Sequence, residues 1–254
     1  MCFPYDAEPP IARLAGGSVE HTDLTLEAED GNVFSAFLAE GDGSREASVV
    51  VLPDVRGLFR FYEELALRFA DQNIDALAID YFGRTAGLEK RDADFEWQEH
   101  VAQSTFDGVR SDVAAAVAYL RKSNPDRPVF TLGFCFGGSN SWHQAANGLD
   151  LAGAVGFYGH PNRPEFPQNA LGVQQRVTDI SCPILGLMGG ADQGIPQDIV
   201  SEFEQELKQH GVESEIVIYD GAPHSFFDRH YEEFADQSAD AWSRVLNFIS
   251  GHAD

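Results

Sequence analysis

The chain has 254 residues, a length that suits a single α/β domain with one buried core. Its hydrophobic content of 43% and charged content of 23% are those of a globular protein, which argues against wholesale disorder. With 17 basic and 41 acidic residues the formal net charge is −24, and such a surface disfavours binding to nucleic acid or to anionic membranes.

The first predicted element is a β-hairpin. Two segments of alternating polarity, residues 19–28 and 32–39, flank an Asp-Gly turn, a pattern typical of two antiparallel strands. Six further strands are predicted where short apolar runs occur, at residues 47–53, 76–81, 129–134, 152–158, 184–188 and 215–219. Helices are predicted between them, at residues 62–71, 106–122, from 137 onward, 199–210 and 234–249.

The alternation of strands and helices predicts βαβ units, and hence a mainly parallel, twisted sheet with helices on both faces. The hairpin would add antiparallel strands at its N-terminal edge. No repeat or flexible linker interrupts the alternation, so we expect one domain over residues 1–254, without a separate cap domain. Residues 83–103 are polar and lie where a small lid would be. Ligands of such sheets bind beyond the carboxyl ends of the strands, and we expect the functional site there.

A nucleophile candidate stands at one of these strand ends. The predicted strand 129–134 continues into Gly-Phe-Cys-Phe-Gly-Gly at Gly133–Gly138 and then into a helix. This is the G-x-nucleophile-x-G pattern of a strand–turn–helix motif, with Cys135 as the nucleophile. Glycines are needed there because the tight turn leaves little room, and the helix amino end favours a thiolate and a developing oxyanion. The alternative is a buried structural cysteine that happens to lie between glycines.

Two later strand ends supply partners for a thiol. Asp192 follows the strand 184–188, and His224 follows the strand 215–219. A histidine can accept and return the thiol proton, and a carboxylate can fix the orientation of that histidine. Taken singly, Asp192 is more typical of a turn and His224 of a capped or core histidine. All three together, each just past an apolar strand, favour a catalytic triad.

The chain resembles the dienelactone hydrolase (carboxymethylenebutenolidase-like) family of α/β-hydrolases over essentially its full length. The motifs that carry the resemblance are Gly133–Gly138, Gly-Gly-Ala-Asp at Gly189–Asp192 and Gly-Ala-Pro-His-Ser-Phe at Gly221–Phe226. The order of nucleophile, acid and histidine is also that of the α/β-hydrolases. The resemblance implies the α/β-hydrolase fold, and a Cys-His-Asp triad that acts on esters or lactones through an acyl-enzyme.

Acyl transfer also needs two donors for the oxyanion. One is expected to be the N–H of Phe136, the residue after the nucleophile, and the second comes from the loop after the strand 47–53. The resemblance implies that this second donor is the N–H of Val55. It also implies a thiol-modulating role for Asp54, where family members typically carry a Glu. Because Asp is one methylene shorter, a turn or helix-capping role is the alternative for Asp54.

Substrate contacts are predicted from position alone. Arg56 shares the loop of the second oxyanion donor, Arg84 and Trp97 lie in the polar segment 83–103, and Tyr158 ends a strand. Dienelactone hydrolases proper carry, four residues after the catalytic His, an Arg that binds the substrate carboxylate, and here that position holds Asp228. Arg229 is adjacent and is the candidate substitute. For each of these residues a packing or surface role is the alternative.

Other kinds of site are not predicted. The sequence has neither the G-x-x-x-x-G-K-[ST] nor the G-x-G-x-x-G pattern, and neither H-E-x-x-H nor an EF-hand occurs, so we expect no cofactor and no metal. Three widely spaced cysteines do not form a disulfide framework. The chain start does not read as a secretory signal, and no apolar run approaches the ~18 residues that span a bilayer. We therefore expect a cytoplasmic monomer or small homo-oligomer.

The predicted function is hydrolysis of small esters or lactones. One alternative is thioesterase or amidase activity at the same site, and another is a non-enzymatic protein that senses thiol chemistry or binds a ligand on this scaffold. The charge of −24 and the absence of an Arg at position 228 favour neutral substrates over anionic ones.

Overall fold

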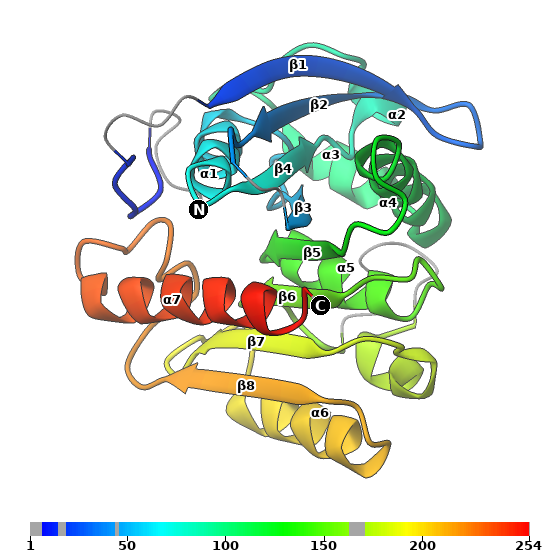
Figure 1. Ribbon diagram of the computed structural model, residues 1–254. Helices are drawn as coiled ribbons and strands as arrows, with labels where there is room; N and C mark the ends of the chain where they lie inside the picture. Colours follow the sequence, from blue (N-terminus) through cyan, green and yellow to red (C-terminus); the bar gives the residue numbers. More distant parts are fainter. Residues whose placement is uncertain (1–6, 15–18, 44–45, 163–170, 254) are drawn as a thin grey trace.

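The computed structural model describes residues 7–14, 19–43, 46–162 and 171–253. Its described strands form one eight-stranded sheet in the order β1-β2-β4-β3-β5-β6-β7-β8 (Figure 1). The strands are β1 (Glu20–Glu27), β2 (Val33–Glu40), β3 (Ala47–Leu52), β4 (Ile74–Ile79), β5 (Val129–Phe134), β6 (Gly153–Phe157), β7 (Ile184–Gly189) and β8 (Ser214–Tyr219). The helices are α1 (Arg60–Ala70), α2 (Gly83–Ala86), α3 (Trp97–Gln103), α4 (Phe106–Leu120), α5 (Phe136–Ala145), α6 (Gln197–Gln209) and α7 (Ala235–Gly251), with a 3-10 turn at Val173–Asp179.

The predicted fold class is confirmed. Strands β3 to β8 run parallel to one another, and the hairpin of β1 and β2 lies at the edge of the sheet. Strand β2 is antiparallel both to β1 and to β4, so β1 points in the same direction as the parallel strands. The hairpin therefore contributes one reversed strand to the sheet among the described residues.

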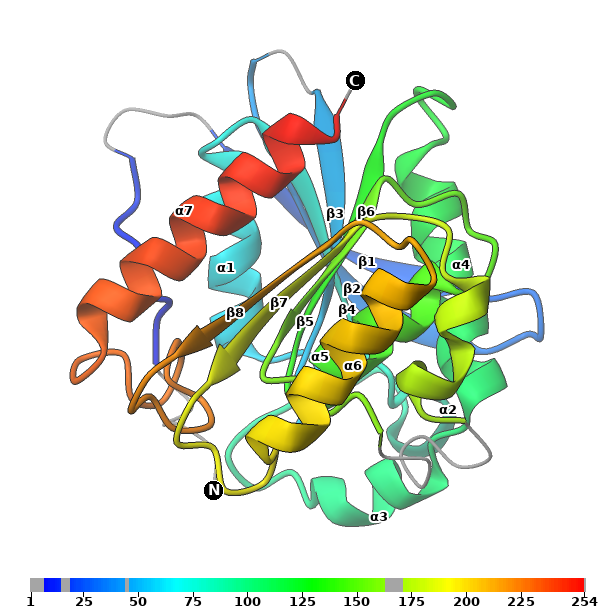
Figure 2. The same ribbon diagram turned by 90° about the horizontal axis from the view of Figure 1, so that it is seen from below.

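Helices cover both faces of the sheet, as Figure 2 shows: α1 and α7 lie on one side, and α4, α5 and α6 on the other. On the first side Phe69 of α1 packs on Trp242 of α7, with ring centroids 4.7 Å apart. On the second side Trp142 of α5 packs on Phe203 of α6 at 5.2 Å. The central strands β3, β4, β5, β6 and β7 are buried along their whole length, which explains why they appear in the sequence as uninterrupted apolar runs.

The sequence patterns missed the short helices α2 and α3 and the 3-10 turn. Helix α3 has the sequence WQEHVAQ, and Val101 is its one buried residue, so it shows no apolar periodicity. The predicted polar segment 83–103 thus contains two short helices. Within the described residues, no helix is both long enough and apolar enough to cross a bilayer.

Candidate active site

Cys135 lies at a sharp turn between β5 and α5. Its backbone angles are φ 55° and ψ −112°, a left-handed conformation that costs a non-glycine residue about 1–3 kcal/mol and that is found preferentially at functional sites. The N–H of Cys135 donates a hydrogen bond to the carbonyl of Phe157, at 3.0 Å, which anchors the turn to β6. The side chain is partly exposed. The turn therefore presents the thiol beyond the carboxyl end of the sheet.

The glycines around Cys135 are required sterically. A Cβ atom on Gly133 would lie 2.0 Å from the carbonyl oxygen of Gly137. A Cβ atom on Gly137 would lie 2.0 Å from the carbonyl oxygen of Leu52. Both contacts are with backbone, which cannot move aside as a flexible side chain can. The spacing of these glycines thus follows from the close approach of the start of α5 to the ends of β5 and β3.

We expect Gly137→Ala to lower the free energy of unfolding by about 3 kcal/mol or more, because the new methyl group overlaps backbone atoms. Urea unfolding followed by circular dichroism measures this. Gly251→Ala is the matched control, since a Cβ atom there meets nothing within 4 Å. An equal effect in the two variants would contradict the steric explanation.

His224 and Asp192 are brought together by the last two strands. Gly189 at the end of β7 pairs with Tyr219 at the end of β8, and the N–H of Ala191 donates to the carbonyl of Ala222 at 2.9 Å. Across these joined loops, Nδ1 of His224 lies 2.6 Å from Oδ2 of Asp192.

Asp192 uses both carboxylate oxygens. Oδ1 accepts the N–H of Gly194 at 2.8 Å, a turn contact of the kind expected for an aspartate in this loop. Oδ2 faces His224, and the Asp192 side chain is only 1% exposed. The residue therefore combines the turn role and the contact with His224, which were alternatives in the sequence.

His224 is held in its charged form by its partners. Burial of the ring opposes protonation, but hydrogen bonds and electrostatic interactions with Asp192 and Cys135 outweigh it and raise the pKa of His224 from 6.5 to about 10. The same contact identifies Cys135 as the second neighbour of the imidazole. The structure thus places His224 between Asp192 and Cys135.

The two predicted oxyanion donors follow the ends of neighbouring parallel strands. Leu52 of β3 pairs with Gly133 of β5, and the loops that follow these strands carry Val55 and Phe136. Phe136 is the first residue of α5, so its N–H has no acceptor within the helix.

Asp54 is engaged by Arg56. Its carboxylate accepts the backbone N–H of Arg56 at 2.8 Å and lies 3.0 Å from the Arg56 guanidinium. The guanidinium also lies over the ring of Phe59, 3.9 Å from its centroid. The thiol-modulating role of Asp54 remains a prediction. Its carboxylate forms an ion pair with Arg56, the residue that was predicted from the sequence to contact the substrate.

Three of the other residues predicted to contact the substrate each have a different environment in the structure. Arg84 forms ion pairs with Asp30 and Asp112, the second at 2.8 Å, and these pairs tie the hairpin to α4. Trp97 begins α3 and packs half-buried against the core. Arg229 is exposed.

Tyr158 is 0% exposed, so it does not present a surface to the solvent-accessible site. Its ring lies against His224, with centroids 4.8 Å apart, and its hydroxyl donates to Oδ2 of Asp228 at 2.6 Å. The sequence pointed to Asp228 only as the residue that replaces an arginine. A carboxylate directly after Phe226 and Phe227 was the available signal that it is buried.

A further buried titratable side chain lies in α5, the helix that begins directly after Cys135. His143 of α5 is 2% exposed, packs edge-on against Phe106, and its Nδ1 has no hydrogen-bond partner among the described residues. Burial first, and the nearby Arg176 guanidinium second, lower the pKa of His143 from 6.5 to about 3. The histidine is therefore neutral in the folded protein and must take up a proton when the chain unfolds in acid.

We expect this histidine to make the protein acid-sensitive. The pKa of His143 is lower in the folded than in the unfolded state. Its contribution to the free energy of unfolding is therefore complete above pH 6.5, and it falls by about 1.4 kcal/mol per pH unit between pH 6.5 and about pH 3. Urea unfolding of wild type and His143→Phe at several pH values measures the difference. His210→Gln, at the exposed residue that follows α6, is the control. Parallel curves for wild type and His143→Phe would contradict the assignment.

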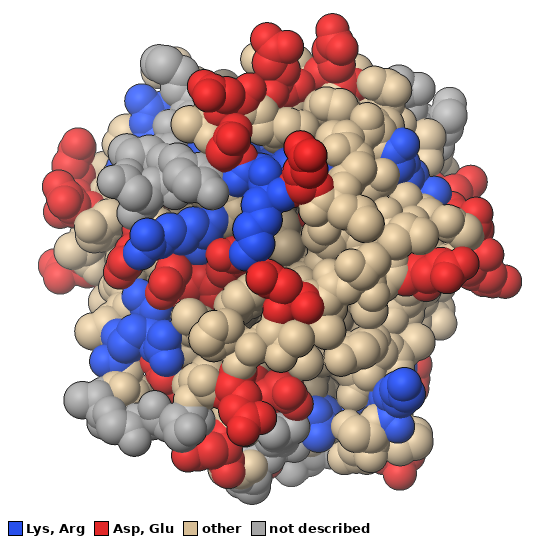
Figure 3. All heavy atoms as spheres, turned by 90° about the horizontal axis from the view of Figure 1, so that it is seen from above, with Lys and Arg blue, Asp and Glu red and all other residues tan. Residues whose placement is uncertain are grey.

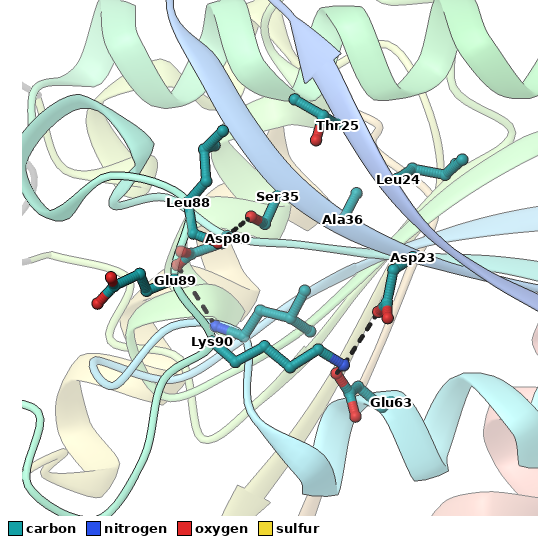
Figure 4. Close-up of a pocket in the computed structure, with 11 residues that line it drawn as sticks. Asp23, Leu24, Thr25, Ser35, Ala36, Glu63, Asp80, Leu88, Glu89 and Lys90 are labelled. Atoms are coloured by element: carbon teal, nitrogen blue, oxygen red, sulfur yellow. Dashed lines mark hydrogen bonds and ion pairs between the residues drawn. The ribbon is translucent and has the colours of Figure 1, made fainter.

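A separate cavity of about 190 Å³ lies at the hairpin edge of the sheet (Figure 4). Lys90 reaches across its rim to Asp23 and Glu63, at 3.0 and 2.9 Å. Figure 3 shows the face over β1, where basic side chains lie among acidic ones rather than apart from them. Neither Cys135 nor His224 lines this cavity, so it is distinct from the candidate active site. Across the described ranges, no three His, Cys, Asp or Glu side chains are arranged to hold a metal ion.

Comparison with known proteins identifies the family of the chain. Residues 34–253 match the model of the dienelactone hydrolase family. A protein of Methylorubrum extorquens with carboxymethylenebutenolidase in its name is 26% identical over 97% of this chain and 86% of its own. A Bradyrhizobium protein named as a 2-oxo-3-(5-oxofuran-2-ylidene)propanoate lactonase is 30% identical over 82% of this chain and 85% of its own. A Klebsiella pneumoniae structure with dienelactone hydrolase in its name superposes with a TM-score of 0.80, at 23% identity, over 92% of this chain and 99% of its own.

Proposed function

Because the chain belongs to the dienelactone hydrolase family, we propose that it hydrolyses small uncharged esters or lactones with Cys135 as the nucleophile. The observation that carries the proposal is the contact of His224 with both Asp192, at 2.6 Å, and the thiol on its strained turn. Relatives named as carboxymethylenebutenolidase and lactonase support the ester and lactone class.

In the first half of the reaction the Cys135 thiolate attacks the carbonyl carbon. A carbon–sulfur bond forms, and the carbonyl electron pair moves to oxygen, where the N–H groups of Val55 and Phe136 stabilise the negative charge. When the intermediate collapses, the carbon–oxygen bond to the alcohol breaks and the His224 imidazolium donates a proton to the leaving oxygen. The product is a thioester between the acyl group and Cys135.

In the second half, neutral His224 takes a proton from water as the water oxygen attacks the thioester. The same two N–H groups stabilise the second oxyanion. The carbon–sulfur bond then breaks, the carboxylic acid leaves, and the thiolate is restored beside protonated His224. Asp192 orients the imidazole throughout and remains ionised.

The charges around the site support uncharged substrates. Asp228 stands where an arginine would bind a substrate carboxylate, and it is buried. Arg56, the nearest predicted cation on the oxyanion loop, is already paired with Asp54 at 3.0 Å. The net charge of −24 also disfavours the approach of an anionic acyl group.

A substrate panel tests the proposal. We expect measurable kcat/KM for neutral aryl acetates and lactones, and a lower kcat/KM, by about tenfold or more, for matched esters that carry a free carboxylate on the acyl group. The same panel should include a thioester and an amide of the same acyl group. Preference for the carboxylate-bearing ester would contradict the proposed substrate class, and absence of turnover on the whole panel would contradict the proposed activity.

A further inference from the structure

Tyr158 joins all three elements that carry the proposed catalytic residues. Its neighbour Phe157 accepts the N–H of Cys135, and its own N–H donates to the carbonyl of Leu187 in β7, at 2.9 Å. Its ring faces His224 at 4.8 Å. The backbone of Tyr158 has φ 38°, a value unfavourable for a bulky residue, which persists only where the surroundings hold it.

The hydroxyl of Tyr158 fixes the far end of the ring. It donates to Oδ2 of Asp228 at 2.6 Å, and the other oxygen, Oδ1, accepts the N–H of Arg229. Both side chains are fully enclosed, with Tyr158 0% and Asp228 2% exposed. Since Asp228 lies four residues after His224, this bond ties the histidine-bearing segment back to the end of β6.

Burying the charged Asp228 carboxylate in this way is unfavourable in free energy. Burial raises the pKa of Asp228, and the carboxylate of Asp54 adds to the effect, whereas the Tyr158 hydroxyl and positively charged His224 oppose it. The hydroxyl of Tyr62 in α1 accepts the backbone N–H of Asp54 at 2.9 Å, and both carboxylates act electrostatically on this hydroxyl. A satisfied polar network in such surroundings restricts side-chain motion more than a surface pair does.

His224 needs a second constraint besides Asp192. A single hydrogen bond between Nδ1 and Asp192 leaves the imidazole free to rotate about the axis of that bond. The Tyr158 ring, tilted by 54° to the imidazole with the centroids 4.8 Å apart, limits this rotation and helps to keep Nε2 directed at the thiol. Displacement by about 1 Å at a catalytic group can cost about 100-fold in rate.

We propose that Tyr158 and Asp228 are positioning residues, and that the hydrogen bond between them holds the Tyr158 ring against His224 so that the imidazole stays aligned with Cys135. The expected loss of kcat rests on the proposed function. The alignment of the His224 imidazole with the Cys135 thiol does not, because it concerns only the contact between these two side chains.

Two measurements on the full-length chain test the inference. In Tyr158→Phe and Asp228→Ala we expect kcat for a neutral ester to fall about 10- to 100-fold with KM changed less than about threefold. We also expect the pH profile of Cys135 alkylation by iodoacetamide to shift towards higher pH, because a misaligned imidazolium stabilises the thiolate less. Asp228→Asn, which retains an acceptor for the hydroxyl, should recover most of both properties.

Tyr219→Phe is the matched control. It removes a bond of the same kind, from the Tyr219 hydroxyl to Asp240 at 2.8 Å, at a tyrosine that does not contact His224. Alkylation is measured with Cys2 replaced by Ser, and urea unfolding corrects for the folded fraction. An unchanged alkylation profile in Tyr158→Phe, or equal shifts in Tyr158→Phe and Tyr219→Phe, would overturn the inference. Since alkylation needs no substrate, it decides the point even if the substrate panel shows no turnover.

Discussion

Replacing Cys135 by Ala is expected to lower kcat/KM for a neutral ester by at least about 10⁴-fold, because the attacking atom and the acyl-enzyme are both lost. The fold should be retained, since Ala is smaller than Cys and the side chain is partly exposed. Steady-state hydrolysis of an aryl acetate, with circular dichroism to verify folding, measures the effect.

Cys182 provides the control for this variant. It lies just before β7 and is 8% exposed, and burial raises the pKa of its thiol to about 12. We expect Cys182→Ala to keep turnover within about twofold, as a substitution away from the reacting atoms does. Turnover retained in Cys135→Ala, or lost equally in Cys182→Ala, would contradict the assignment of the nucleophile.

The second large effect is expected for Asp192→Asn, about 10³-fold on kcat. An amide can present its NH₂ group to Nδ1 of His224 and so stabilise the wrong tautomer, and it removes the negative charge that helps to raise the pKa of the imidazole. The alkaline limit of the kcat/KM profile should therefore shift to lower pH. The amide oxygen can still accept the N–H of Gly194, so the turn should persist.

Stopped-flow hydrolysis between pH 5 and about pH 10 measures both the fall in kcat and the shift of the alkaline limit in Asp192→Asn. Asp198→Asn is the matched surface control, because this aspartate is exposed in the first turn of α6. An Asp192→Asn profile that superposes on the wild-type profile would show that the carboxylate does not orient His224.

Much of the fold could be predicted from local patterns. The strand 129–134 was predicted with the observed boundaries, since a fully buried strand is apolar without interruption. Strand β4 begins at Ile74, two residues before the prediction, because Asp75 is polar and yet buried. Its carboxylate lies 2.6 Å from the guanidinium of Arg127, a partner 52 residues away that no local pattern reveals.

In the candidate site, too, some features could be predicted from the sequence and others could not. Cys135, Asp192 and His224 each follow an apolar strand, so the topology of a parallel sheet was enough to predict that they meet. Arg84 was predicted to contact substrate, but its partners Asp30 and Asp112 come from the hairpin turn and α4. The bond from Tyr158 to Asp228 spans 70 residues. Pairings of this kind depend on the three-dimensional packing of loops, which sequence spacing does not encode.

The covalent role of Cys135 is tested most directly by intact-protein and peptide mass spectrometry after rapid quenching of the reaction with an aryl acetate. Before the steady state, we expect one acetyl group on the peptide that contains Cys135, formed as fast as the alcohol is released and absent from Cys135→Ala. Release of the alcohol by wild type without acetylation of that peptide would contradict the proposed acyl-enzyme mechanism.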